Sequence, residues 1–270
     1  MTTDNRETLI LSPRYTSDSI SLAGEAASAG WRVERLSTWR APIHLRNSQP
    51  VIYGEPLFVA AICEELNLAA FEPPFPWLAS VPYQYRLREV EFANLAEARH
   101  RDRRTFIKPA DDKCFQAAVY DSGQDLPSLA ALPDSTPVLI SEPVSWAVEF
   151  RTFVLHKRVM TLSVYSRNGD LAQSPEGDWP ASQLETAAAF DFATSVLSDS
   201  AIPLPPAVVL DVGLIPDRGW AVVEANASWA SGIYGCHPAT VLRVLTAAFK
   251  HTSDLSEYDM TWIPPRNADV

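Results

Sequence analysis

Short apolar runs alternate with helix-like stretches along the first quarter of the chain. The predicted elements there are a strand at 9–11, a helix at 18–30, strands at 31–36 and 51–53, and a helix at 57–66. This alternation of strands and helices predicts a small open α/β unit over residues 1–75. The passage 72–82 is rich in proline and therefore predicts a linker to a second domain.

Strand-like runs dominate the part of the chain beyond the linker. The predicted elements are helices at 86–100, 181–198 and 238–250 and strands at 105–108, 115–120, 137–141, 148–156 and 158–166. We expect one larger α/β (α+β) domain over residues 76–255, followed by a loose tail at 256–270.

The most informative pattern is a predicted β-hairpin near the end of the larger domain. Two apolar, β-branched runs at 208–214 and 220–226 flank a turn rich in Pro, Asp and Gly. Asp211 can lie beside the end of the partner strand that carries Glu224 and Asn226, and these two residues share a face because they are two apart. Three oxygen side chains on one patch of sheet suit Mg²⁺. The alternative is a hairpin whose polar residues simply face solvent.

Composition and charge narrow the classes of function. The chain has 270 residues, 47% of them hydrophobic and 20% charged, as in an ordinary globular protein. Its formal net charge of −11 argues against general nucleic-acid binding and against binding to an anionic membrane, since both would be repelled. A basic cluster at 99–104 is the local exception. It is typical of a solvated helix end, and a role in binding a polyanion such as an acidic peptide stays open.

Cysteine usage and the N-terminus indicate a compartment. Cys63, Cys114 and Cys236 are widely spaced and odd in number, so neither a disulfide framework nor a zinc site is indicated. The first residues lack the pattern of a signal peptide, and no apolar run reaches the ~18 residues of a membrane span. We therefore expect a soluble, cytoplasmic protein with no membrane association.

Several familiar catalytic motifs are missing from the sequence. There is no GxGxxG, no GxxxxGK[ST], no GxSxG and no HExxH. Dinucleotide-binding, P-loop, serine-hydrolase and zinc-protease interpretations are therefore disfavoured.

Cations lie at the ends of predicted strands. Lys108 ends an apolar strand, and Lys113 follows across a short loop. Two ammonium groups beside a loop would suit a triphosphate, because phosphoryl chemistry depends on charge stabilisation; surface lysines are the alternative. Glu149 and Arg151 share a strand face and would suit either a structural ion pair or a site, and Arg167 ends the next strand.

Taken in order, these pieces resemble the ATP-grasp superfamily, in particular its carboxylate–amine ligases and a bacterial and phage branch. The stretches that carry the resemblance are Trp77-Leu78, Phe106 to Lys113, Ser141 to Val144, Glu149 to Arg151, and Asp211 with Glu224-Ala225-Asn226-Ala227-Ser228. It covers about residues 75–245. It implies an ATP-grasp domain of two subdomains with a hinge near 142–146, preceded by the small α/β domain typical of the family.

The resemblance implies a nucleotide site for ATP. By position, Lys108 would hold the α- and β-phosphates, and Lys113 would lie in the loop that covers the triphosphate. Glu142 and the backbone of Val144 would form the hinge that contacts adenine. Glu149 falls where the family places its ribose-binding carboxylate.

The resemblance also implies the catalytic groups. Arg151 and Arg167 would face the γ-phosphate and an acyl-phosphate intermediate. The metal motif of the family implies that Asp211, Glu224 and Asn226 ligate Mg²⁺. Metal and arginines would together neutralise the charge on the transferred phosphoryl group.

Two details of the implied site are less regular. The phosphate loop, residues 109–114, has no glycine and contains Asp111 and Asp112, so Lys113 replaces backbone contacts, or the acids turn outward or help to hold metal. Ser228 and Ser231 follow the metal motif directly and are the candidate substrate residues.

The sequence thus predicts an ATP- and Mg²⁺-dependent ligase that activates a carboxylate as an acyl phosphate for attack by an amine. Its partners would be small-molecule or peptide carboxylates and amines. The alternatives are an ATP-grasp phosphotransferase and a non-catalytic nucleotide-binding module.

Overall fold

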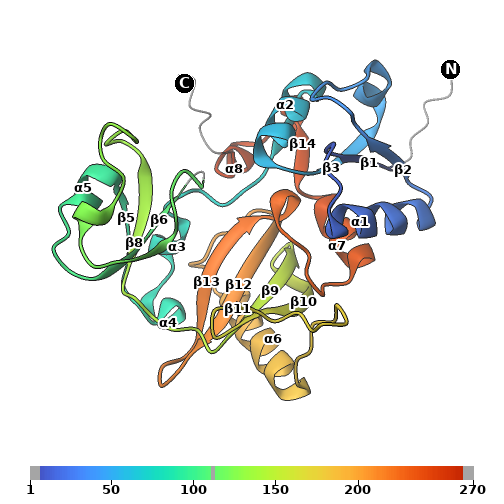
Figure 1. Cartoon of the computed structure of the whole chain (residues 1–270). Coiled ribbons are helices and arrows are strands. Elements are labelled where there is room, and N and C mark those ends of the chain that lie inside the picture. Colours follow the sequence, from blue (N-terminus) through green and yellow to red (C-terminus); the bar gives the residue numbers. More distant parts are fainter. Residues whose placement is uncertain (1–6, 111–112, 264–270) are drawn as a thin grey trace.

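The chain is described by a computed structural model that places residues 7–110 and 113–263. Within these ranges the strands form sheets of three, five, two and four strands. Figure 1 shows three bodies: an N-terminal unit, a five-stranded sheet below it, and a smaller four-stranded sheet at the left.

The N-terminal unit is built on a parallel sheet with strand order β2-β1-β3. Its elements are β1 (Glu7–Leu11), α1 (Ser17–Ser28), β2 (Arg32–Arg35), the 3-10 helix η1 (Ile43–Asn47), β3 (Gln49–Tyr53) and α2 (Pro56–Leu66). Leu9 to Leu11 are fully buried, as a strand covered on both faces requires. Thr16 caps α1 by accepting a hydrogen bond from the backbone N–H of Ser19. The predicted open α/β unit is confirmed.

The largest sheet is antiparallel, with strand order β11-β10-β9-β12-β13. Its elements are β9 (Val148–Leu155), β10 (Arg158–Arg167), β11 (Asp170–Leu171), α6 (Gln183–Ser198), β12 (Ala207–Ile215) and β13 (Gly219–Ala227). The predicted hairpin is β12 and β13, and its turn uses positive φ angles at Asp217 (64°) and Gly219 (110°). Buried residues of α6 and one face of this sheet share a hydrophobic core.

The four-stranded sheet has the order β5-β8-β6-β7. Its elements are β5 (Val90–Asn94), α5 (Leu95–Arg99), β6 (Thr105–Pro109), β7 (Ala118–Tyr120), the 3-10 helix η2 (Gly123–Asp125) and β8 (Pro137–Ser141). One face, with Ile107, Val138 and Ile140, shares a small core with Leu95 and Ala98 of α5.

The C-terminal part of the chain returns to the N-terminal unit. Its elements are the 3-10 helix η3 (Ser228–Ala230), α7 (Pro238–Leu245), β14 (Phe249–His251), the 3-10 helix η4 (Thr252–Asp254) and α8 (Glu257–Met260). Strand β14 pairs with β4 (Leu68–Ala70), and α7 packs against α1. The predicted helix at 238–250 is therefore too long. The loose tail predicted from residue 256 is wrong as far as Ile263, because α8 forms there and Trp262 is only 3% exposed. The rest of that tail lies outside the described residues.

The region around residue 90 differs most from the prediction. The helix predicted at 86–100 is wrong: this segment contains strand β5 and the short helix α5. Asn94 and Glu97 form a capping box, which starts a helix at Leu95 rather than at residue 86. The proline-rich passage contains the short helices α3 (Trp77–Ser80) and α4 (Tyr83–Arg86), and the strand predicted at 115–120 is limited to β7.

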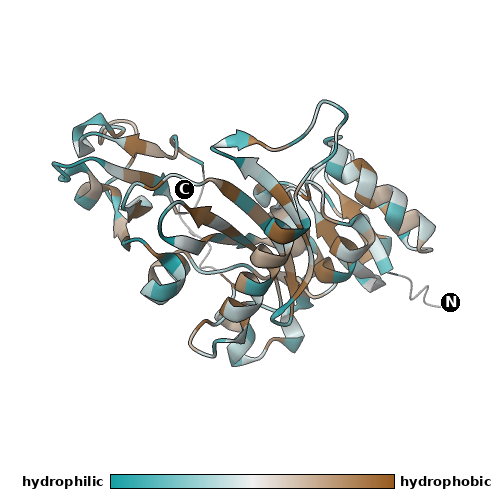
Figure 2. Cartoon of the chain, turned by 90° about the horizontal axis from the view of Figure 1, so that it is seen from below, coloured by the Kyte–Doolittle hydropathy of each residue, from teal (hydrophilic) through white to brown (hydrophobic). Residues whose placement is uncertain are grey.

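Hydrophobic residues concentrate on the strands and on the helix faces that cover them, whereas the outer helix faces are more hydrophilic (Figure 2). No helix of the described residues is long and apolar enough to cross a membrane.

Two glycines give a test of this packing. A Cβ at Gly123 would lie 2.2 Å from the carbonyl oxygen of Ala98, whereas a Cβ at Gly24, inside α1, meets nothing within 4 Å. We expect Gly123→Ala to lower the free energy of unfolding by about 1–3 kcal/mol because the backbone of α5 must shift. Gly24→Ala should raise it by about 0.5–1 kcal/mol. Urea unfolding measures both, and equal effects of the two substitutions would contradict the packing described.

Candidate functional site

A row of charged side chains crosses one face of the five-stranded sheet. Arg151 on β9 lies opposite Asp211 on β12, and Asp211 lies opposite Glu224 on β13. Direct cross-strand partners share a face. Two residues along β9, Phe153 is on the same face but is fully buried in the core of the N-terminal unit. The face thus changes from charged to apolar within two residues.

Arg151 and Asp211 form a buried bidentate ion pair. Arg151 Nε and Nη2 donate to Asp211 Oδ1 and Oδ2 at 3.0 and 2.6 Å, and Arg151 Nη1 donates to the carbonyl of Gly232 at 3.0 Å. Burial alone would lower the pKa of Arg151, but the charge of Asp211 raises it well above its usual value. Burial raises the pKa of Asp211 to about 6, against the opposing effect of Arg151. The guanidinium is therefore a fixed positive charge.

Two tyrosines hold the same guanidinium from the side. Its carbon lies 5.3 Å from the ring centre of Tyr165 and 4.8 Å from that of Tyr234. The two rings stack on each other at 5.2 Å. Their hydroxyls are not ionised at neutral pH, because burial raises the pKa of both.

Glu224 is held by a lysine from the smaller sheet. Lys108 Nζ on β6 contacts Glu224 Oε2 at 2.5 Å, and Asn226 Nδ2 donates to Glu224 Oε1 at 2.8 Å. Burial would raise the pKa of Glu224, but the charge of Lys108 lowers it to about 2. Glu224 is therefore a carboxylate at neutral pH, and the pair joins the two sheets.

A β-bulge turns Glu224 toward this row. Asp211 pairs with Glu224 and Val212 pairs with Val222, which leaves Val223 as an extra residue. In a regular strand Val222 and Glu224 would share a face. With the bulge, Val222 lies in the core beneath α6 while Glu224 faces the other way.

Arg88, which the sequence analysis did not identify, braces this bulge. Its side chain is buried and donates to the carbonyls of Val222 (2.7 Å) and Val223 (2.9 Å), and it lies 4.9 Å from the ring centre of Trp146. Burial lowers its pKa to about 10, so it remains charged at neutral pH. Nothing in a single sequence shows which carbonyls an arginine will meet.

A second bulge separates Arg167 from the row. Val164 pairs with Phe150 and Ser166 with Glu149, so Tyr165 is the extra residue and Arg167 faces α6. Its guanidinium donates to both carboxylate oxygens of Glu185, at 2.7 and 3.1 Å. The structure does not place Arg167 with the other predicted site residues, because the predicted alternation does not include this bulge.

The smaller sheet presents an apolar face on the side of Lys108. Phe106 and Lys108 share this face by alternation. Their cross-strand partners, and those partners' own, place Phe92, Val119, Leu139 and Ser141 there too. Phe92 and Val119 are each 39% exposed. The sequence analysis missed Phe92 because it assigned a helix there, although Phe106 alternates visibly with Lys108.

The connection between the two sheets carries the other predicted nucleotide residues. Val144 lies between β8 and β9, and the Glu142 carboxylate pairs with Arg218 at 2.6 and 3.0 Å, an exposed contact across the hinge segment. Glu149 Oε2 accepts a hydrogen bond from the hydroxyl of Tyr165 at 2.8 Å. Lys113 follows β6 and is exposed, while Asp111 and Asp112 lie outside the described residues.

The predicted substrate serines are buried rather than exposed to a cavity. Ser228 is fully buried, and among the described residues its hydroxyl is one of the buried groups that lack a hydrogen-bond partner. Ser231 donates to the carbonyl of Ala227 at 2.7 Å. The segment is also tied to the N-terminal unit, because Asp18 Oδ2 accepts a hydrogen bond from the backbone N–H of Ile233 at 3.0 Å.

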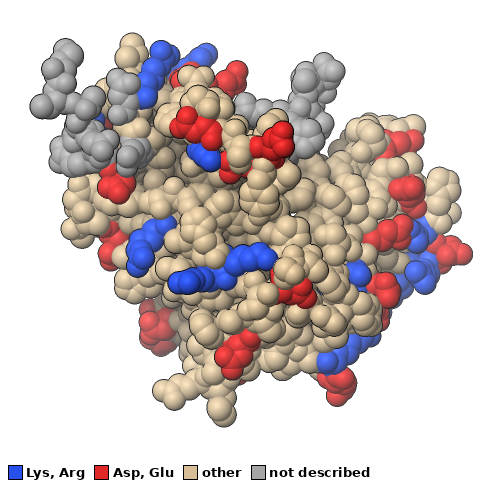
Figure 3. Space-filling model, turned by 180° about the vertical axis from the view of Figure 1, so that it is seen from behind, with Lys and Arg blue, Asp and Glu red and all other residues tan. Residues whose placement is uncertain are grey.

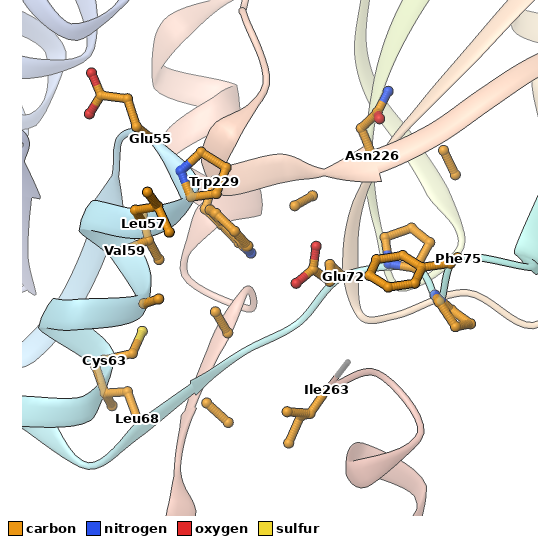
Figure 4. Close-up of a pocket in the computed structure, with 18 of the residues that line it drawn as sticks. Glu55, Leu57, Val59, Cys63, Leu68, Glu72, Phe75, Asn226, Trp229 and Ile263 are labelled. Atoms are coloured by element: carbon orange, nitrogen blue, oxygen red, sulfur yellow. The ribbon is translucent and has the colours of Figure 1, made fainter. Parts of the chain in front are cut away.

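A cavity of about 1540 Å³ connects the charged row with the N-terminal unit. Lys108, Glu224 and Asn226 line one end, and α2, β4 and the C-terminal segment line the other. Figure 4 shows Asn226, Glu72, Phe75, Trp229 and Leu57 around this space.

Oxygen donors, rather than a cluster of histidines or cysteines, characterise the site. Within the described ranges, no group of three or more His, Cys, Asp and Glu residues could hold a metal ion. The predicted set differs because it consists of two carboxylates and the amide of Asn226, and these lie on neighbouring strands facing the same side.

Surface charge adds no second site. In the basic cluster, Arg99 pairs with Asp134, Arg101 with Glu91, and Arg104 with Asp121. Seen from behind, acidic and basic side chains are interspersed over the molecule (Figure 3).

The fold recurs in solved structures. D-cycloserine synthetase DcsG aligns with a TM-score of 0.56 at 12% identity over 89% of this chain and 98% of its own. An N5-carboxyaminoimidazole synthetase from Staphylococcus aureus aligns with a TM-score of 0.53 at 12% identity over 92% and 80%. A D-alanine–D-alanine ligase from Bacillus anthracis complexed with ATP aligns with a TM-score of 0.50 at 10% identity over 91% and 97%. At these identities the likeness shows the fold alone.

Sequence comparison identifies the family. No curated protein matches the chain. Residues 85–244, more than half of the chain, match a family described as an ATP-grasp domain, the second family of its clade. The resemblance expected from the sequence is confirmed, and this chain belongs to that family of the ATP-grasp superfamily.

Proposed function

We propose that this protein is an ATP- and Mg²⁺-dependent ligase that activates a carboxylate as an acyl phosphate and joins it to an amine. One observation carries the proposal: within an ATP-grasp fold, Lys108, Arg151, Asp211, Glu224 and Asn226 gather between an apolar sheet face and a cavity. The ligases and synthetases that share the fold support the reaction class.

The residues present fit a magnesium ion. Asp211, Glu224 and Asn226 offer hard oxygen ligands, and Lys108 already places a positive charge against Glu224. Asp211, Glu224 and Asn226 would hold the ion. When bound, the metal would neutralise phosphate charge.

The nucleotide would lie between the two sheets. Phe92, Phe106 and Leu139 offer an apolar wall for a planar base, and Glu149 offers a carboxylate for the ribose hydroxyls. Lys108 would contact the phosphates. The backbone of 142–146 would face the edge of the base, since the Glu142 side chain is engaged by Arg218.

Arg151 supplies fixed positive charge beside the reacting groups. Because its raised pKa and its bonds to Asp211 and Gly232 hold it charged and oriented, it needs no rearrangement when negative charge develops. Arg167 has no part in this proposal, since it pairs with Glu185 on the opposite face.

The products test the reaction class. With ATP, Mg²⁺, a carboxylate and an amine, we expect ADP, phosphate and an amide, with phosphate release that depends on the amine. A phosphorylated product formed without amine would indicate the phosphotransferase instead. No ADP under any condition would leave the non-catalytic module.

A lysine substitution tests the site within the same assay. Lys108→Met should lower the rate of ADP formation about 10²–10³-fold, because one charge that acts on the phosphates is lost. Lys250→Met is the matched control, since Lys250 also pairs with a carboxylate, Asp259, but outside the site. Equal rates in the two variants would contradict the assignment of Lys108.

The bulge gives an independent prediction. Arg88→Met removes the donors to the carbonyls of Val222 and Val223 and should lower the free energy of unfolding by about 1–3 kcal/mol. Because Glu224 then loses its support, Mg²⁺-dependent ATP binding should weaken about 10–100-fold. Urea unfolding and calorimetry measure the two effects. The control is Arg101→Met, whose exposed pair with Glu91 contributes less than about 1 kcal/mol; unchanged ATP binding by a folded Arg88 variant would contradict the bracing role.

A further inference from the structure

The cavity has an apolar end that the nucleotide does not explain. The nucleotide would bind near Lys108 and Glu224 at one end, yet the space continues to α2 and β4 in the N-terminal unit. Its far walls are formed by Leu57 and Ala60 of α2, Phe75 of the linker, Trp229, Leu255 and Ile263. At about 1540 Å³ it is larger than the roughly 300–1000 Å³ typical of a single ligand pocket.

Large apolar side chains at this end remain in contact with solvent. Leu57 is 68% exposed and Trp39 is 48% exposed, and both line the cavity. An exposed leucine alone needs no explanation. Together with half-buried Phe75 and Ile263 around one space, however, these residues form an apolar surface that a ligand would cover with a gain in free energy.

Continuity with the charged row identifies the occupant. The same cavity is lined by Glu224 and Asn226, beside which the phosphoryl group of ATP would lie under the proposed function. A molecule whose carboxylate reaches that end directs the rest of its length along the apolar walls. We infer that the carboxylate substrate carries a bulky aliphatic or aromatic group, which binds against α2, Phe75 and Trp229. This inference rests on the proposed function and adds the chemical class of the substrate.

A series of carboxylates tests the inference without a known substrate. The probes are butanoate, hexanoate and octanoate, titrated by calorimetry into the full chain in the presence of ADP and Mg²⁺. Burial of each methylene is worth a factor of about four in affinity. We expect octanoate to bind more than tenfold more tightly than butanoate, and a flat series would overturn the inference.

Matched substitutions locate the binding. Leu57 is the second residue of α2, and Leu184, which is 84% exposed, is the second residue of α6 away from the cavity. Leu57→Asp should abolish the gain with chain length, whereas Leu184→Asp should preserve it. Ala60→Phe, which fills the cavity, should weaken octanoate about tenfold or more, while Ala61→Phe on the same helix should not. A gain with chain length that both cavity variants retain would overturn the inference.

The outcomes also separate a failure of the substrate class from a failure of the proposed function. If ATP binds with Mg²⁺ and is turned over but the series is flat, the proposed function stands and the apolar substrate class fails. If ATP does not bind at all, the proposed function fails, and with it the inference that rests on it. If only a chain shortened to end at Ile263 shows the gain with chain length, the cavity accommodates the chain's own C-terminal residues, and the inference is overturned.

Discussion

The buried pair of Arg151 and Asp211 is the interaction on which the rest of the site depends. It lies where one face of the five-stranded sheet changes from charged to apolar, next to Phe153 in the core of the N-terminal unit. A charge buried at such a boundary is costly unless it is paired and fully hydrogen-bonded. Arg151 meets this condition through Asp211, Gly232 and two tyrosine rings. Removing either partner would leave the other as an uncompensated charge.

The ion pair also ties chemistry to domain architecture. Gly232, which accepts from Arg151, precedes Ile233, whose backbone N–H donates to Asp18 of α1. The Lys108–Glu224 pair connects the same row of charges to the smaller sheet. Three bodies of the fold thus meet at one row of side chains, so their relative position determines the shape of both the nucleotide space and the cavity.

Much of this arrangement follows from the sequence, for identifiable reasons. The β12–β13 hairpin was predictable because apolar runs flank a turn of Pro, Asp and Gly, and its acids interrupt those runs visibly. Lys108 was predictable because it ends an apolar strand. The positions of Arg167 and Arg88 were not, because both depend on bulges: one extra residue, Tyr165 or Val223, reverses every side chain beyond it. The strand at Val90–Asn94 was missed because its residues also suit a helix, and only the capping box at Asn94 marks the true start.

The central claim is that the oxygen ligands on β12 and β13 bind ATP through Mg²⁺, and calorimetry of ATP with and without Mg²⁺ tests it most directly. The comparison is between the wild type, Glu224→Ala and Glu185→Ala, in which Glu185 is a carboxylate that pairs with Arg167 outside the site. The account predicts Mg²⁺-dependent binding in the wild type and in Glu185→Ala, and its loss in Glu224→Ala. Binding that is independent of Mg²⁺ and unaffected by Glu224→Ala would contradict it.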